Sequence, residues 1–325
     1  MNIVKVFARI GKRALVRMVG IADNYKVIRE NGSPVYINER HYYKFKHVEV
    51  EKRLSRFQLL QLISYHFYAD GRGLIKHLHL QTLADQLGCH VKTLKLNHDI
   101  LVEEGYINYS HAGKGRVNIS LCDYHTYHLK KHEGGYGYLT LSQDTLQALI
   151  DMKDVNALRL TLRHLLKGDS MSEEPKEGLF SRLTEIKGMI PRYLRYKKAI
   201  VSLFDKARSI IQSRTFSTAI KYHIRGSHNS RIQKERYFQE HFNDIHQYCQ
   251  HELKEKPALR RLFSSLDDVV TLSFEYGLDT VLNGLQLVFY QLDKDNYQTI
   301  RNLGAYLRQV IDKNLHLPKL GWFYQ

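Results

Sequence analysis

The sequence has few cysteines and no long apolar run. Its 325 residues include only Cys89, Cys122 and Cys249, which are too few and too scattered for a disulfide scaffold or a CxxC metal knuckle. No stretch approaches the ~20 apolar residues that a helix needs to span a bilayer. We therefore expect a protein of the reducing cytoplasm that does not insert into a membrane and that associates with the nucleoid if it binds DNA.

Motifs for enzymatic chemistry are also scarce. The sequence holds no GxxxxGK(S/T) phosphate loop, so ATP-driven unwinding by this chain is not expected. His77 and His79 flank a leucine, as in the metal-binding histidine pair of rolling-circle nickases, while His125, His128 and His132 recur at helical spacing. A metal-dependent nickase or recombinase therefore stays an alternative, with a solvent-facing cluster as the default for the second set. We assign no catalytic residue, metal ligand or cofactor.

Acidic residues are in deficit. Lysine and arginine outnumber aspartate and glutamate by 49 to 33, which gives a formal net charge of +16. Between Ser181 and Arg236, fourteen basic residues stand against Glu185, Asp205 and Glu235, a local net charge of +11. Such an excess attracts polyanions and favours nucleic acid as the partner, although a solvated basic surface or an anionic membrane surface would also fit.

The segment Leu78–Leu121 carries the clearest local pattern. Thr82 can cap a short helix, and Gly88 permits a tight turn into a second helix that runs from about Val91 to Glu104. The residues expected to face inward are Leu83, Ala84, Leu87, Val91, Leu94, His98 and Leu101 or Val102. The opposite face of the second helix presents His90, Lys92, Thr93, Lys95 and Leu96.

Two predicted strands complete this segment. Gly105 ends the second helix, residues 106–110 alternate as a strand, and Val117–Leu121 returns from a basic tip at Gly113–Arg116. Helix, turn, helix, strand, basic tip and strand is the order of elements in a winged helix.

Residues 82–107, TLADQLGCHVKTLKLNHDILVEEGYI, resemble the winged helix-turn-helix family of bacterial transcription regulators and replication initiators. The resemblance covers roughly 45 to 70 residues, and its most specific part is EEGYI with the following wing. It implies that the major groove receives His90, Lys92, Thr93 and Lys95, and that the DNA backbone or minor groove is contacted by Lys114 and Arg116. His98 departs from the aliphatic residue that is usual in the family.

A weaker pattern predicts a second module of the same kind. Tyr138–Ser142 is predicted to form a strand, followed by two helices within residues 142–166. Pro191 suits the first position of a further helix, and Ala219–Arg225 is expected to be a strand of a second wing. The residues expected to contact DNA here are Lys187, Arg192, Tyr193, Arg195, Tyr196, Lys198 and Arg225. A plain helical domain with a basic face is the alternative.

The first twenty residues contain five basic side chains and no acid. Their apolar residues recur at helical spacing, at Ile3, Phe7, Ile10 and Ala14, and predict a basic amphipathic helix that lies on DNA, on the protein or on a membrane surface. Farther along, Tyr25–Ile37 predicts a hairpin around Asn31-Gly32, and Val50–Tyr68 predicts a helix.

The sequence thus predicts a mainly α fold with small β-wings, of the α+β class, with winged helices and a C-terminal helical domain. The expected domains are a basic arm and hairpin at 1–48, a winged helix at 49–134, a second basic module at 135–230 and the helical domain at 231–325. No internal repeat occurs at a fixed period. The expected function is sequence-specific binding of double-stranded DNA, as a plasmid- or phage-type replication initiator or a transcription regulator working with the corresponding machinery. A homodimer stays open, and a protein-binding adaptor that uses the winged-helix fold is a further alternative.

Overall fold

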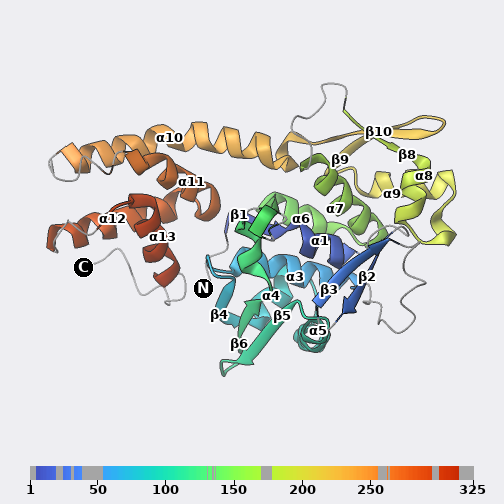
Figure 1. Ribbon diagram of the computed structural model, residues 1–325, viewed down its shortest axis with the longest axis horizontal. Helices are drawn as coiled ribbons and strands as arrows, with labels where there is room; N and C mark the ends of the chain where they lie inside the picture. The colour runs from blue at the N-terminus through green and yellow to red at the C-terminus, as the bar shows by residue number, and fades with distance from the viewer. Residues whose placement is uncertain are drawn as a thin grey trace.

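A computed structural model describes residues 5–19, 25–30, 33–38, 54–129, 131–133, 135, 137–169, 178–254, 262, 264–294 and 300–314. The fold is mixed α+β, mainly helical, with small antiparallel sheets (Figure 1). None of the helices in these ranges is both long and apolar enough to cross a membrane.

One order of elements occurs twice in the body of the molecule. Apart from a hairpin of β2 (Tyr25–Glu30) and β3 (Ser33–Asn38) inserted between α1 and α3, the first series is β1 (Phe7–Gly11), α1 (Lys12–Val19), α3 (Arg56–Tyr68), β4 (Leu74–His79), α4 (Leu80–Leu87), α5 (Val91–Glu103), β5 (Ile107–His111) and β6 (Arg116–Leu121). The second is β7 (Tyr138–Ser142), α6 (Gln143–Asp151), α7 (Val155–Asp169), β8 (Leu179–Arg182), α8 (Leu183–Met189), α9 (Lys197–Lys206), β9 (Ile211–Thr215) and β10 (Ala219–Ile224). Both three-stranded sheets place the last strand in the middle, with orders β4-β6-β5 and β8-β10-β9.

The two series meet at their first strands. β1 pairs antiparallel with β7 in a register that runs from Phe7↔Ser142 to Gly11↔Tyr138. In both series a helix begins at the residue that follows this strand. Because the two paired strands occupy equivalent places in their series, their antiparallel pairing generates a local two-fold relation through the central pair Arg9↔Thr140.

Helix α3 is the centre of the first series. Ser55 and Gln58 form a capping box at its start, in which each side chain accepts a hydrogen bond from the other residue's N–H. The helix is buried from Gln58 to Tyr68 and packs on β1, α4, α5 and α6. Because α3 is buried on all sides, it fixes the positions of α4 and α5 around it.

The described residues form two cores. One runs without interruption from Ala8 to Ile224 through both series. The other, from Ile245 to Ile311, lies among four helices: α10 (Ser230–Lys254), α11 (Leu266–Tyr276), α12 (Leu278–Lys294) and α13 (Leu303–Asn314). The helix α10 leads from the body to the other three, which stand to one side of it (Figure 1).

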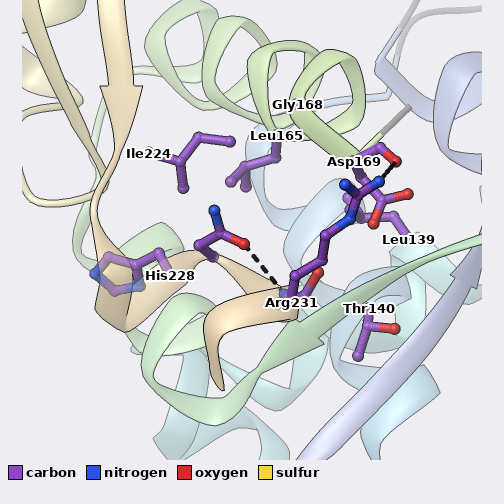
Figure 2. Close-up of a pocket in the computed structure, with 10 residues that line it drawn as sticks. Leu139, Thr140, Leu165, Gly168, Asp169, Ile224, His228 and Arg231 are labelled. Atoms are coloured by element: carbon purple, nitrogen blue, oxygen red, sulfur yellow. Dashed lines mark hydrogen bonds between the residues drawn. The ribbon is translucent and has the colours of Figure 1, made fainter. Parts of the chain in front are cut away.

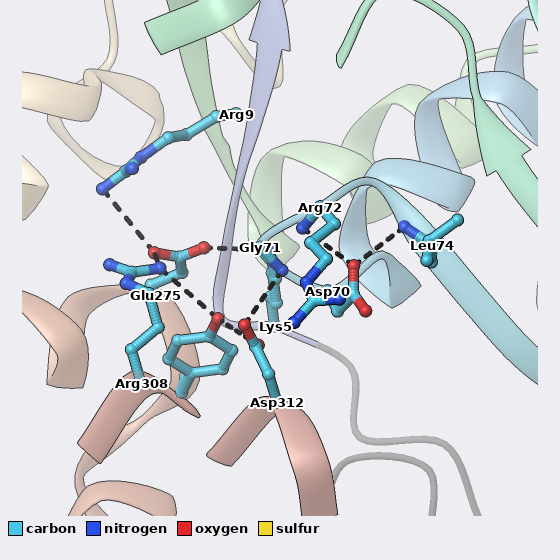
Figure 3. Close-up of polar contacts among 10 residues, drawn as sticks. Lys5, Arg9, Asp70, Gly71, Arg72, Leu74, Glu275, Arg308 and Asp312 are labelled. Atoms are coloured by element: carbon cyan, nitrogen blue, oxygen red, sulfur yellow. Dashed lines mark hydrogen bonds and ion pairs between the residues drawn. The ribbon is translucent and has the colours of Figure 1, made fainter. Parts of the chain in front are cut away.

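A buried ionic cluster joins the two cores (Figure 3). The Lys5 ammonium lies 2.9 Å from the Glu275 carboxylate, which also contacts Arg308 at 2.9 Å and Arg9 at 3.6 Å. Asp312 accepts hydrogen bonds from the Tyr276 hydroxyl and the Gly71 amide. Lys5 and Glu275 are almost fully buried, so the ion pairs of this cluster replace the water that would otherwise solvate their charges.

Several expectations from the sequence are confirmed. The hairpin comprises β2 and β3, whose register closes at Glu30↔Ser33, while Asn31-Gly32 lies outside the described residues. The predicted helix Val50–Tyr68 begins at Arg56 within the described residues. Helices occupy the C-terminal region as expected, while the proposed domain boundaries stay a prediction.

Three expectations are wrong. Phe7 and Ile10 lie in a strand and not in an amphipathic helix, because β7 supplies a pairing partner that local spacing does not reveal. Ala14 does lie in a helix, α1, and Ile3 lies outside the described residues. Thr82 is inside α4, which begins at Leu80, where the Leu80 N–H donates to the Gly115 carbonyl. Pro191 does not start a helix, since residues 192–194 form a 3₁₀ turn and α9 begins at Lys197.

Candidate nucleic-acid interface

Helix α5 presents an exposed basic face at its N-terminal end. His90 precedes the helix as its N-cap, and the side chains of Lys92 and Lys95 are exposed beside Leu96, whose exposed fraction is 58%. Thr93 is half-buried and therefore presents less surface than the sequence suggested. The first turn contains no acid, so the lysines add to the partial positive charge of the helix N-terminus.

The hairpin between β5 and β6 ends in a short cationic tip. Gly113, Lys114 and Gly115 all have positive φ angles, 75°, 48° and 73°. Glycine adopts positive φ angles without strain, whereas lysine does so only at a cost. The two glycines therefore lie on either side of the one strained residue, Lys114. Lys114 and Arg116 are exposed, as expected for a tip that reaches toward a partner.

Contacts to β5 hold α5 in place beside this hairpin. The Tyr109 hydroxyl donates to Asp99 at 3.1 Å, and the Tyr109 ring lies 4.7 Å from the buried His98 ring. His98 also bonds to the Tyr65 hydroxyl. Burial lowers the pKa of His98 to about 4, so the ring is neutral at pH 7. The histidine that departs from the usual aliphatic residue thus has a structural partner on α3.

The second series carries a comparable exposed region before and within α9. Tyr193 and Tyr196 have exposed fractions of 71% and 60%, and Lys198 is exposed in the first turn of the helix. Lys197, which sequence reasoning left out, is exposed beside it, and this turn also lacks an acid. Lys187 is exposed in the last turn of α8. Four of the seven residues predicted here therefore lie on the surface close together along the chain.

The other three predicted residues differ from this group. Arg195 is half-buried and its Nε donates to the Ile190 carbonyl, which holds the turn before α9. Arg225 is exposed, but its Nε donates to the Arg208 carbonyl at 2.8 Å, at the end of β10 far along the strand from the hairpin turn. The Arg192 side chain lies outside the described residues.

In the described ranges, no group of three His, Cys, Asp or Glu residues is placed to hold a metal ion. His77 and His79 are both exposed on β4. A small hollow lies where α10 leaves the body (Figure 2). There the Asp169 carboxylate pairs with Lys12 at 2.9 Å and the Asp169 carbonyl accepts from Arg231, contacts that fix α10 to α1 and α7.

Comparison with known proteins found no matching family model, no similar curated protein and no similar solved structure. Function must therefore be argued from the geometry of the chain itself.

Proposed function

We propose that this protein binds double-stranded DNA sequence-specifically through two winged-helix units, as a replication initiator of the plasmid or phage type or as a transcription regulator. The first unit comprises β4, α4, α5, β5 and β6, and the second comprises β8, α8, α9, β9 and β10. The observation that carries the proposal is the recurrence of one order of elements, in which each second helix begins with exposed lysines.

Charge and helix geometry support the same function. His90 and Tyr196 cap α5 and α9 without a side-chain hydrogen bond to the first turn. The N–H groups of a first turn, together with lysines such as Lys92 and Lys198, suit the phosphates of a backbone. Neither first turn contains an acid that would repel them.

The two parts of the first unit would divide the work of recognition. Lys95 and Leu96 project from the exposed face of α5, and such a face reads base edges when a helix lies in the major groove. Lys114 lies at a hairpin tip, where a cation contacts phosphates or the minor groove. Specificity should therefore depend on α5, and general affinity on the tip.

Two units in one chain favour the initiator over a single-headed regulator. An initiator must hold an extended or repeated site, and two linked reading heads gain affinity because the second binding event becomes intramolecular. The continuous core from Ala8 to Ile224 holds the two units in one body.

The test begins with the full chain and a random pool of duplexes. Duplexes recovered after selection are titrated at several salt concentrations with the wild type, Lys95→Ala, Lys114→Ala and Lys313→Ala. Lys313 is an exposed lysine of α13 and serves as the matched control. Lys95→Ala should cost on the order of 1–3 kcal/mol on the selected duplex and little on a scrambled one. Lys114→Ala should weaken both duplexes alike, and Lys313→Ala neither.

Affinity should fall steeply as salt rises, because each phosphate contact releases a counterion. An affinity that does not change with salt would refute duplex binding through these surfaces. Equal losses on selected and scrambled duplexes for Lys95→Ala would refute the role of α5 in sequence reading.

A further inference from the structure

The sheet β8-β10-β9 has one face that packs on the core and one that faces outward. Ile220, Tyr222 and Ile224 of β10 are buried, and the residues that alternate with them, Lys221 and His223, are half-buried on the outer face. The pairing register continues this outer face onto both neighbouring strands, since Lys221 lies opposite Phe180 of β8 and Arg214 of β9.

Two aromatic rings and three cations share this outer face. Phe180 is 50% exposed and Phe216, at the hairpin turn after β9, is 41% exposed. The Lys221 ammonium lies 5.4 Å from the centre of the Phe180 ring, and the Arg214 guanidinium lies 5.6 Å from that of Phe216. Arg182 extends the basic row at the end of β8. The hairpin that carries Phe216 projects away from the body (Figure 1).

Burial does not account for these rings. A phenylalanine that is half exposed on an open strand forgoes much of the free energy that enclosure would give it. The strand positions of this face, which all lie within the described ranges, include no acid. Glu185 of α8, three residues after the end of β8, pairs with Lys167 at 3.0 Å, and Glu177, two residues before β8, lies outside the described residues.

The equivalent sheet of the first series exposes Lys76 and His77 on its edge strand β4, but its other two strands carry no aromatic ring on the outer face. The outward residues of β5 and β6 include Asn108, Ser110, Asn118 and Ser120, which are small and polar, and Asn118 donates to Ser110. The two sheets share one topology, but the side chains on their outer faces, which do not pack on the core, differ. The exposed phenylalanine rings are therefore a property of the second sheet and not of the architecture.

We propose that the outer face of β8-β10-β9 binds single-stranded nucleic acid, at a site separate from the duplex-reading faces of α5 and α9. Exposed aromatic rings interleaved with cations are the general means of holding a single strand, because every base has a face that can stack and every nucleotide has a phosphate. The charge of this face selects a polyanion, and its rings select bases that are not already enclosed in a duplex.

The geometry assigns a role to each group. Phe180 and Phe216 are separated by two strand spacings across the sheet and by two residues along it, which corresponds to roughly 12 Å. Successive stacked bases are only about 3.4 Å apart, so the two rings would stack on bases that are not adjacent. Lys221 and Arg214 lie between the rings across the sheet and would contact the connecting phosphates.

The experiment measures fluorescence anisotropy of the full chain with a labelled oligo(dT) of about 16 nucleotides, within the range of single-strand site sizes. A duplex of random sequence is titrated in parallel. Phe180→Ala should lower the affinity for oligo(dT) about 5- to 150-fold, the loss expected for one stacked base, and leave the duplex affinity unchanged. Phe180→Trp should retain binding, whereas Phe180→Leu, which is apolar but has no ring, should lose it. Tyr290→Ala removes another aromatic side chain, 58% exposed on α12, and should change nothing.

Each result decides for or against the proposal. Absence of oligo(dT) binding by the wild type, or equal affinities of the wild type and Phe180→Ala, would overturn it. Full binding by Phe180→Leu would also overturn it and indicate an apolar surface for a protein partner. If circular dichroism shows that Phe180→Ala is unfolded, Lys221→Gln decides, because it should weaken oligo(dT) binding and reduce the magnitude of the salt slope by about 0.7. Replacing oligo(dT) with oligo(U) distinguishes DNA from RNA, and single-strand binding without duplex binding would reject the proposed function alone.

Discussion

At the scale of single residues, three histidines are enclosed in the body with neutral rings. His66 and His164 each bond through Nδ1 to the carbonyl four residues earlier in their helices, and His98 bonds to Tyr65. Burial lowers the pKa of each ring to about 4. An unfolded chain returns these rings to a pKa near 6.5, so protonation favours unfolding.

This difference predicts acid sensitivity in a defined window. Between about pH 6.5 and pH 4 the unfolded chain binds more protons than the folded one, so the free energy of unfolding falls as the pH falls. Each histidine contributes up to about 1.4 kcal/mol per pH unit there, and its contribution is complete above pH 6.5. Urea unfolding at a series of pH values measures this slope. His66→Gln should reduce the slope, exposed His125→Gln should not, and a stability that is constant across the window would contradict the prediction.

The carboxylate of Glu275 carries the second prediction at this scale. Burial disfavours its charge, but Lys5, Arg308 and Arg9 outweigh burial and hold its pKa well below the usual range. Glu275→Gln removes the carboxylate that pairs directly with the enclosed Lys5 and should cost about 3–5 kcal/mol of unfolding free energy at neutral pH. Because the folded pKa is depressed, this stabilisation is complete above the unfolded value of about 4.3 and is lost as the pH falls below it.

Chemical denaturation at neutral pH checks the effect of Glu275→Gln. The matched control is Glu240→Gln, which removes the exposed partner of Arg236 on α10 and should leave the denaturation midpoint unchanged. Equal midpoints for Glu275→Gln and the wild type would mean that the cluster contributes no net stability.

At the scale of elements, the sequence predicted what local chemistry determines. Gly88 has a left-handed φ of 63° between α4 and α5, and Gly105 one of 68° after α5, as their positions in the pattern required. The sequence could not reveal β1, because its buried residues do not alternate and its partner strand β7 lies far along the chain. The same holds for Phe180 and Arg214, which share a face only because β10 lies between their strands.

Most of the predicted interface residues are exposed as expected, because their positions follow from the local sequence pattern. Lys92 and Lys95 follow from the 3.6-residue period of one helix, which a sequence displays directly. The predicted helix start at Pro191 was wrong, because the Leu194 N–H donates to the Pro191 carbonyl and closes a tight turn. The helix α9 therefore begins at Lys197. Proline is compatible with either arrangement, and the choice depends on packing that the local sequence does not specify.

Helix α5 gives a prediction that concerns its apolar surface. Leu96 lies one turn from Lys92 with 58% of its side chain exposed, so it can contact a thymine methyl group in the major groove. Leu96→Ala should reduce discrimination at a thymine position of the selected duplex by about 1 kcal/mol and leave thermal stability unchanged. Val102→Ala is the control, since Val102 is also partly exposed but lies about 240° around the same helix. Equal effects of the two substitutions would argue against a base contact by Leu96.

At the scale of the whole molecule, the pairing of β1 with β7 sets the relation between the two series. Its local two-fold relation means that equivalent parts of the two series run in opposite directions where they meet. Two reading heads related in this way would contact DNA segments of opposite orientation. The target should therefore contain two contacted segments, and affinity should depend on their angular position around the duplex.

Insertion of base pairs between the two segments tests this arrangement. About five extra base pairs turn one segment to the far side of the duplex and should reduce binding to that of a single segment. About ten extra pairs restore its angular position and should weaken binding less. Binding that ignores both insertions would show that only one unit reads the selected site.

The ionic joint also bears on how the chain is made. Lys5 precedes its partner Glu275 by 270 residues. At a translation rate of about 5–20 residues per second, roughly 15 to 55 seconds pass on the ribosome between the two. During that interval the Lys5 ammonium must stay hydrated, and β1 cannot take its final place before β7 emerges. The strand β1 can therefore pair once β7 has been made, whereas Lys5, two residues before it, meets its partner only after α11 has been made.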